Sequence, residues 1–305
     1  MSSEHRFILV VSHTGRKDSV DAATQVIRQL QESGAHPVLA RVERDELRAA
    51  GAVFENVAIL DDDVSGEELE LVIVLGGDGT ILRAAELVRG FAAPLLGVNL
   101  GHVGFLAESE RDDLADAVHR VIDGDYLVEE RLALSVRVKV GDDVVWESWA
   151  LNEATVEKGS RERMLEVVIE VDGRPLSSFG CDGVVVSTPT GSTAYGFSAG
   201  GPVVWPTVEA MMLVPLSAHA LFARPLVVGP DSSLAVEVLQ RTSATGVLWC
   251  DGRRTHELQP GARVVVRRSP IPVRLARLHQ SPFTDRLVKK FHLPVTGWRG
   301  PDGND

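Results

Sequence analysis

The sequence predicts an α/β domain with a parallel sheet, followed by a β-rich sandwich domain. Two changes of pattern support this: the first half alternates apolar runs with amphipathic stretches, and the second half has short apolar runs split by Gly, Asp and Pro. The length of 305 residues is enough for two hydrophobic cores. The pattern changes near Tyr126, so we place the domains at 1–127 and 128–278. A tail at 279–305 has the pattern of a short amphipathic helix and could pack back on the first domain.

In the first domain we expect strands and helices to alternate. Uninterrupted apolar runs predict strands at 6–13, 36–42, 69–77 and 93–100, and helical periodicity predicts helices at 19–34, 80–91 and 111–126. The first helix should end at Gly34, and the second should begin at Thr80, a good N-cap residue. This order favours a Rossmann-like sheet that is covered on both faces.

In the second domain, short apolar runs predict strands and Gly-containing pairs predict hairpin turns. The expected strands lie within 131–140, 142–157, 163–176, 181–188, 224–230, 233–240, 245–252 and 262–268. The sequences VGDD, DGRP and CDGR are typical of tight hairpin turns. One helix, interrupted by prolines, is expected within 200–216.

Composition excludes several classes of protein. A net charge of −12 repels polyanions, so we expect no nucleic-acid partner. No apolar run is long enough to cross a membrane, and no signal peptide is evident, so we expect no membrane association. Cys181 and Cys250 form neither a disulfide framework nor a zinc motif, which favours the reducing cytoplasm.

A glycine-rich turn with an acidic residue in it follows the third predicted strand. In LGGDGT, Gly76, Gly77, Gly79 and Thr80 would expose backbone N–H groups at a helix start, where phosphate binds. The turn lacks the lysine of a P-loop and has Asp78 instead. Asp78 could cap the helix locally. Alternatively, it could take a proton from an acceptor hydroxyl, or help hold Mg²⁺, in a phosphoryl-transfer site.

Two further glycine-rich segments could line the same cleft. PLLGVNLGHVGFLAE at 94–108 has glycines around Asn99, and it could equally be a simple strand exit. TPTGSTAYGFSAGGP at 188–202 is rich in hydroxyls, carries no charge and is not a nucleophile elbow. Such a loop suits ribose and phosphate, with Tyr195 or Phe197 against a base.

Three other features give weaker signals. Asn152 and Glu153 could bind a ribose or a base, or could simply form a turn. Asp182 precedes a glycine, which by default indicates a hairpin turn. Several arginines could bind phosphate but more commonly lie on solvated faces; these are Arg161, Arg163, Arg253, Arg254, Arg267 and Arg268.

Taken in order, the motifs resemble those of the NAD kinases. The resemblance rests on GGDGT at 76–80, GVNLGHVGFL at 97–106, NE at 152–153 and DGVVVSTPTGSTAYGFSAGGP at 182–202. GGDGT also occurs in diacylglycerol and sphingosine kinases, whereas TPTGSTAY is the specific part. The resemblance implies transfer of a phosphoryl group from ATP or polyphosphate, with Mg²⁺, to the adenosine-ribose 2′-hydroxyl of NAD, giving NADP.

The resemblance also implies site residues. Asp78 would be the proton acceptor, and Gly76, Gly77, Gly79 and Thr80 would form the phosphate-donor loop. The residues that would bind the dinucleotide are Asp78, Gly79, Arg83, Asn152, Glu153, Arg163, Asp182, Thr193, Ala194, Tyr195, Gly196, Phe197 and Ser198. Gly180 stands where some family members have a basic residue, which argues against an additional phosphate contact there. No metal ligand is singled out, and the family implies a homo-oligomer, either a tetramer or a dimer.

Two other functions are compatible with some of these features. A lipid kinase would share GGDGT, but it would need a membrane-facing element that the sequence does not show. A non-catalytic dinucleotide sensor would keep the pocket and would not need Asp78.

Overall fold

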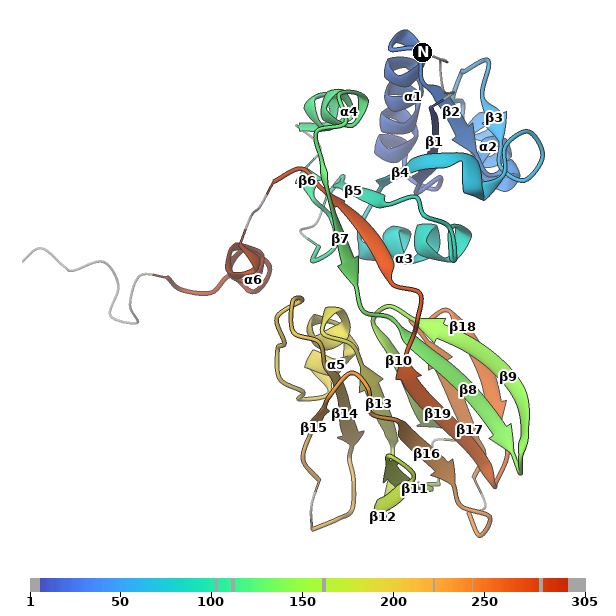
Figure 1. The fold of residues 1–305 in the computed structure, drawn as a ribbon, viewed down its shortest axis with the longest axis vertical. Helices are drawn as coiled ribbons and strands as arrows, with labels where there is room; N and C mark the ends of the chain where they lie inside the picture. The colour runs from blue at the N-terminus through green and yellow to red at the C-terminus, as the bar shows by residue number, and fades with distance from the viewer. Residues whose placement is uncertain are drawn as a thin grey trace, which may run out of the picture. The chain divides into compact units, whose positions relative to one another are not determined.

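The chain folds into two compact units, which we describe separately. The structure is a computed structural model, and it describes residues 6–101, 104–110, 113–160, 163–221, 223–242, 244–279 and 282–295. One unit contains residues 1–130 and 274–305, and the other contains residues 131–273. The α/β and β-rich classes expected from the sequence are both confirmed (Figure 1).

The first unit is built on one sheet with the strand order β3-β2-β1-β4-β5-β20-β7, and β6 also pairs with β5. The central pairs, β1 with β2 and β4 and β4 with β5, are parallel. The strands are β1 (Phe7–Ser12), β2 (His36–Leu39), β3 (Ala58–Ile59), β4 (Leu69–Leu75), β5 (Leu95–Asn99), β6 (Ser109–Glu110), β7 (Leu127–Arg131) and β20 (Val273–Arg277).

In the part of the first unit that the structure describes, the sheet is accompanied by α-helices and a 3₁₀ turn. They are α1 (Lys17–Glu32), α2 (Arg41–Ala49), η1 (Gly66–Glu68), α3 (Asp78–Leu87), α4 (Leu114–Ile122) and α6 (Phe283–Phe291). In α1 the buried residues Val20, Ala23 and Ile27 recur every three or four positions, so one stripe of the helix joins the core. Gly34, with φ +81°, follows the helix end as predicted.

Three predicted elements differ from the structure. The strand expected at 36–42 ends at Leu39, and α2 follows it because the acidic and basic residues from Arg41 onward suit an exposed helix. The helix expected from Thr80 begins at Asp78, because the glycine turn itself supplies the N-cap at Gly77. No helix forms within 200–216, where an irregular segment leads into a buried strand at Met211–Leu216.

The second unit is a sandwich of two antiparallel sheets. One sheet has the order β15-β14-β13-β10-β17-β18, and the other has the order β12-β11-β16-β19-β8-β9. Valines from both sheets, such as Val156 and Val184 of the first and Val167 and Val264 of the second, belong to one hydrophobic core. In strands such as β17 and β19 buried residues alternate with more accessible ones, which explains the period-two pattern there, whereas β13 is buried throughout.

The strands and short helices of the second unit have these bounds: β8 (Leu134–Val140), β9 (Asp143–Ala150), β10 (Glu153–Lys158), β11 (Leu165–Val171), β12 (Arg174–Cys181), β13 (Gly183–Ser187), η3 (Thr190–Thr193), α5 (Tyr195–Ser198), β14 (Met211–Leu216), β15 (Leu226–Val228), β16 (Leu234–Val238), β17 (Gly246–Cys250), β18 (Arg254–Leu258) and β19 (Ala262–Arg268). Positive φ at Asp172 and Gly173, and at Asp251 and Gly252, confirms the DGRP and CDGR hairpin turns.

Among the described residues, no helix is both long enough and apolar enough to cross a bilayer.

Candidate functional site

The Asp78 turn lies where a parallel strand meets a helix. β4 ends at Leu75, and α3 begins at Asp78 after two glycines. Gly76 has φ +157°, and a Cβ added to it would lie 2.4 Å from the Thr80 hydroxyl oxygen, so the turn has no room for a side chain there. The turn therefore presents the N-terminus of α3 with little side-chain cover, an arrangement that suits a phosphate.

The Asp78 carboxylate is fixed by two backbone amides from another loop. Phe105 donates its N–H to Oδ2 at 3.0 Å, and Leu106 donates its N–H to Oδ1 at 3.1 Å. A Cβ on Gly104 would lie 2.4 Å from Oδ1, so glycine is needed there for the carboxylate to sit as it does. The first two predicted loops, 76–80 and 97–106, thus meet at Asp78.

Arg83 has partners on neighbouring elements. Its Nη2 donates to the Ser12 carbonyl at 2.5 Å and lies 3.6 Å from Glu43 Oε2. Glu43 is buried, accepts hydrogen bonds from the backbone N–H and the hydroxyl of Ser12, and has a pKa raised by burial. Arg83 therefore links α3 to the start of α2 and to the end of β1. The sequence alone did not identify Glu43 as one of its partners.

In the second unit, Asn152 and Glu153 are held by the buried carboxylate of Asp251. Oδ1 of Asp251 accepts from the N–H of Asn152 at 2.7 Å and of Glu153 at 3.4 Å, and Oδ2 pairs with Arg254 at 2.7 Å. The CDGR turn thus also anchors the start of β10. Sequence reasoning identified this turn and did not identify the role of its aspartate.

Glu153 is buried beside another acid. Burial, together with the negative charge of Asp251, raises the pKa of the Glu153 carboxyl from 4.5 to about 8, although a backbone hydrogen bond from Tyr195 opposes this rise. Near neutral pH the group therefore carries a proton, and it can donate a hydrogen bond as well as accept one.

The 188–202 loop folds against the same strand end. The N–H of Thr188 donates to the Asn152 carbonyl at 2.9 Å, and a Cβ on Gly191 would lie 2.0 Å from that oxygen. After this packed turn, Tyr195 and Phe197 are 38% and 42% exposed, so both residues can be reached from solvent. The structure thus brings together Asn152, Glu153 and the 193–198 segment.

Asp182 does not lie in the expected hairpin. It connects β12 in one sheet to β13 in the other, because the chain crosses between the sheets there. Its Oδ1 pairs with Lys158 at 2.6 Å, and hydrogen bonds from Lys158 and Ser217 lower its pKa. Arg163 is exposed, just before β11, and Arg161 lies outside the described residues.

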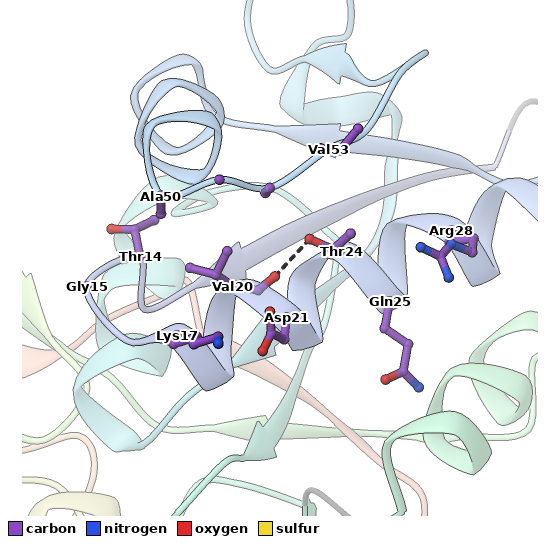
Figure 2. Close-up of a pocket in the computed structure, with 12 residues that line it drawn as sticks. Thr14, Gly15, Lys17, Val20, Asp21, Thr24, Gln25, Arg28, Ala50 and Val53 are labelled. Carbon is purple, nitrogen blue, oxygen red and sulfur yellow. Dashed lines mark hydrogen bonds between the residues drawn. The ribbon is translucent and has the colours of Figure 1, made fainter.

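A pocket of about 870 Å³ lies elsewhere in the first unit and contains none of the predicted site residues. Figure 2 shows that side chains of α1 form one wall, among them Lys17 and Arg28, and that the segment from Ala50 to Val53 forms the other. Thr24 in this wall donates its hydroxyl to the Val20 carbonyl at 2.9 Å (Figure 2). We place the site at Asp78 because two of the predicted motif loops meet there, whereas the pocket is lined by none of the motif residues.

Comparisons with known proteins identify the family. The model described as the ATP-NAD kinase N-terminal domain matches residues 8–126, and the model of the C-terminal domain matches residues 151–278. A curated NAD kinase from Leifsonia xyli subsp. xyli is 73% identical over 300 residues, which cover 98% of this chain and 99% of that protein. The chain belongs to the NAD kinase family. Its activity is accordingly that of a kinase that acts on a hydroxyl group.

Solved NAD kinase structures share the fold. A yeast NADH kinase complexed with NADH has a TM-score of 0.85 at 20% identity, with 97% of this chain and 90% of that chain covered. An NAD kinase from Archaeoglobus fulgidus in complex with ATP has a TM-score of 0.70 at 24% identity, with 95% and 100% covered. The family membership decides between the three functions considered from the sequence in favour of the NAD kinase.

The Asp78 carboxylate fits a magnesium ion that would be bound mainly by the phosphates of the donor. In the part of the chain that the structure describes, no three His, Cys, Asp or Glu side chains gather as a metal-binding group. Mg²⁺ in phosphoryl-transfer sites commonly uses one or two carboxylates together with donor phosphates and water. Asp78 lies beside the glycine turn at the start of α3, so its carboxylate suits the role of such a Mg²⁺ ligand.

Proposed function

We propose that this enzyme transfers a phosphoryl group from ATP or polyphosphate to the 2′-hydroxyl of the adenosine ribose of NAD, giving NADP. The observation that carries the proposal is the Asp78 carboxylate, which two backbone amides hold beside the glycine turn at the start of α3. The family membership gives NAD as the substrate class, and the complexes of the fold relatives with NADH and ATP support the two reactants.

In this proposal Asp78 orients the acceptor hydroxyl and takes its proton. The hydroxyl oxygen forms a bond to the γ-phosphorus, the bond from that phosphorus to the bridging oxygen breaks, and ADP leaves with its electron pair. An aspartate is a weak base, but a loose transition state needs orientation more than early proton removal. The fixed position of the carboxylate serves that need.

The phosphates of the donor would bind at the glycine turn. Gly76, Gly77, Gly79 and Thr80 bring the backbone close, and the positive end of α3 favours the negative charge. Mg²⁺ would enter with the donor and neutralise charge on its phosphates.

Of the residues proposed for the dinucleotide, Asp78, Gly79 and Arg83 belong to the first unit, and the others belong to the second unit. Protonated Glu153 can donate to a ribose oxygen, and Asn152 adds amide groups. The exposed rings of Tyr195 and Phe197 suit stacking against a base. Asp182 and the remaining residues of 193–198, namely Thr193, Ala194, Gly196 and Ser198, would line the same pocket. Arg83 and Arg163 would add positive charge, with Arg83 using the guanidinium donors other than the one on Ser12.

An assay of NADP formation tests the proposal. Wild type, Asp78→Asn and Asp116→Asn are incubated with NAD, Mg²⁺ and either ATP or polyphosphate. Asp116 is the matched control because it is an exposed aspartate in the first turn of α4. We expect a loss of about 100-fold or more in kcat for Asp78→Asn and no loss for Asp116→Asn. Wild-type activity in Asp78→Asn would exclude Asp78 as the base, and parallel kinetics with the two donors would identify the preferred one.

The cytoplasm and a homo-oligomeric state are part of the same proposal. Cys181 and Cys250 are free and buried, which agrees with a reducing compartment. Large apolar side chains such as Trp205, Leu221 and Val227 are exposed on the second unit and would be suited to burial between subunits. Light scattering of the purified protein would distinguish a dimer or tetramer from a monomer.

A further inference from the structure

The loop that holds Asp78 is itself held by α6. Phe105 and Leu106 use their N–H groups for Asp78 and their carbonyls for two arginines. Arg286 of α6 donates to the Phe105 carbonyl at 3.0 Å, and Arg277 of β20 donates to the Leu106 carbonyl at 3.2 Å. The peptide unit between Phe105 and Leu106 therefore donates its N–H to Asp78 and accepts from Arg286 through its carbonyl, and Arg277 binds the carbonyl of the next peptide unit.

A buried carboxylate joins the two arginines to the same loop. The side chain of Glu108 is 1% exposed, and its Oε2 accepts from Arg286 at 2.7 Å and from Arg277 at 2.9 Å. Its Oε1 accepts from the N–H of His279 at 2.9 Å. Arg277 also pairs with Glu129 at 2.7 Å, and the guanidiniums are themselves largely covered, with 8% exposure for Arg277 and 14% for Arg286. Such charge-assisted, buried bonds have specific geometry.

Aromatic packing fixes α6 on the loop. The ring of Phe105 lies 6.0 Å from that of Phe283 and 5.7 Å from that of Phe291, so both ends of α6 contact one residue of the loop. Leu287, between them on the helix, is 9% exposed. Arg286 therefore projects from a helix whose position is set independently of the ion pair.

We propose that Arg286 is a positioning residue for Asp78, acting from α6 through the Phe105 peptide and Glu108 to hold the carboxylate in its reactive orientation. The inference rests on the proposed role of Asp78. Arg277 is a strand residue at the centre of the network, whereas Arg286 is contributed by a separate C-terminal helix. The C-terminal segment is thereby part of the catalytic apparatus of the first unit, without itself touching the reacting atoms.

The test compares three variants of the full chain. Arg286→Met removes the guanidinium and keeps most of the apolar stem, Arg286→Lys keeps the charge, and Lys290→Met removes one positive charge from an exposed position of the same helix. For Arg286→Met we expect kcat to fall about 10- to 100-fold, with KM for NAD and for ATP changed less than about threefold. Arg286→Lys should recover part of kcat, since an ammonium can reach one of the two acceptors at a time. Lys290→Met should match wild type.

Hydrogen–deuterium exchange supplies a readout other than activity. The N–H groups of Phe105 and Leu106 should exchange at least tenfold faster in Arg286→Met than in Lys290→Met, because Arg286 no longer holds the loop that carries these N–H groups. Exchange in β1 and β4 should be unchanged, which shows that the unit remains folded. The inference would be overturned if exchange at Phe105 and Leu106 were unchanged in Arg286→Met. It would also be overturned if the lower kcat of this variant were explained entirely by a smaller fraction of folded protein.

A double variant separates this inference from the proposal for Asp78. If Arg286 acts through Asp78, adding Arg286→Met to Asp78→Asn should lower the residual rate less than twofold. A further 10-fold or greater loss, with Asp78→Asn itself impaired, would overturn the inference and leave the role of Asp78 intact. Full activity of Asp78→Asn alone would overturn the role of Asp78, and the positioning role with it.

Discussion

Glu153 and Asp251 are two buried carboxyl groups in the second unit, and the negative charge of Asp251 adds to burial in raising the pKa of Glu153 to about 8. Burial also raises the pKa of Asp251, and the N–H groups of residues 151–153 together with Arg254 oppose that rise. Asp251 thus anchors the strand end through the hydrogen bonds that it accepts, and burial next to Asp251 favours the protonated form of Glu153.

This pair predicts that stability falls as the pH rises from about 5 to 8. The folded pKa of Glu153 lies above its unfolded value of 4.5, so between these values the folded state binds the additional proton. The contribution of Glu153 to the free energy of unfolding is fully present below the unfolded pKa. It is lost as the pH rises through the folded pKa, at about 1.4 kcal/mol per pH unit or less. Glu153→Gln should remove this dependence, which thermal unfolding at pH 6 and pH 9 would measure. Equal slopes for both proteins would contradict the prediction.

The same titration should affect NAD binding. Above pH 8 the ionised Glu153 can no longer donate a hydrogen bond to the dinucleotide. We expect the affinity of wild type for NAD to weaken by roughly tenfold between pH 7 and pH 9, and that of Glu153→Gln to change much less. Calorimetric titration with NAD would measure both, and an identical pH profile for the two proteins would argue against a contact at Glu153.

Gly104→Ala should reduce activity without unfolding the protein. Its Cβ would lie 2.4 Å from Asp78 Oδ1, so the carboxylate would have to leave its hydrogen bonds. We expect kcat to fall about 10- to 1000-fold with little change in the denaturation midpoint. Gly101→Ala is the matched control in the same loop, because a Cβ there meets no atom within 4 Å. Comparable losses in both variants would show that the loop tolerates no substitution at all.

Glu108→Gln should strongly destabilise the first unit. The neutral amide would leave two largely buried guanidiniums without their shared carboxylate. Breaking one side of a buried ion pair costs about 3–5 kcal/mol. The control is Asp125→Asn, which removes an exposed partner of Arg120 and should cost less than about 1 kcal/mol. Urea unfolding would measure both, and a cost below 1 kcal/mol for Glu108→Gln would contradict the buried network.

Cys181 and Cys250 should not react with thiol reagents in the folded protein. Burial raises the pKa of each thiol to about 12, so almost no thiolate is present near neutral pH. An aromatic disulfide reagent should titrate no cysteine in native buffer and both in guanidinium chloride. Fast labelling of one thiol in native buffer would locate a local opening of the sandwich core.

Features that depend on a local sequence pattern, such as helices, sheet classes and tight turns, were predicted well from the sequence. Apolar periodicity located α1 and the two sheet classes, and Gly34 and the Asp-Gly pairs predicted a helix end and two hairpins. The helix expected within 200–216 was wrong, because Met211–Leu216 is buried as a strand between β13 and β15, where tertiary pairing outweighs helix propensity.

The contacts around Asp78 could be predicted only in part. Glycine-rich exits from neighbouring strands indicated that 76–80 and 97–106 would lie near one another. Nothing local marks Glu108, Arg277 or Arg286, because each arginine lies more than 150 residues from Glu108 in the sequence. Asp251 was likewise read as a turn residue, and its carboxylate proves to anchor a strand 99 residues earlier. The predicted roles of the site residues remain to be tested by the variants above.

The sheet of the first unit has consequences for how the protein is made. β7 and β20 are neighbours in that sheet, yet all of residues 132–272 are translated between them. The ribosome therefore releases the complete sandwich before it releases the last strand of the domain that was begun first, and α6 follows later still. An incomplete nascent chain thus carries the glycine turn and Asp78 but lacks α6, whose Arg286 binds the loop that holds Asp78.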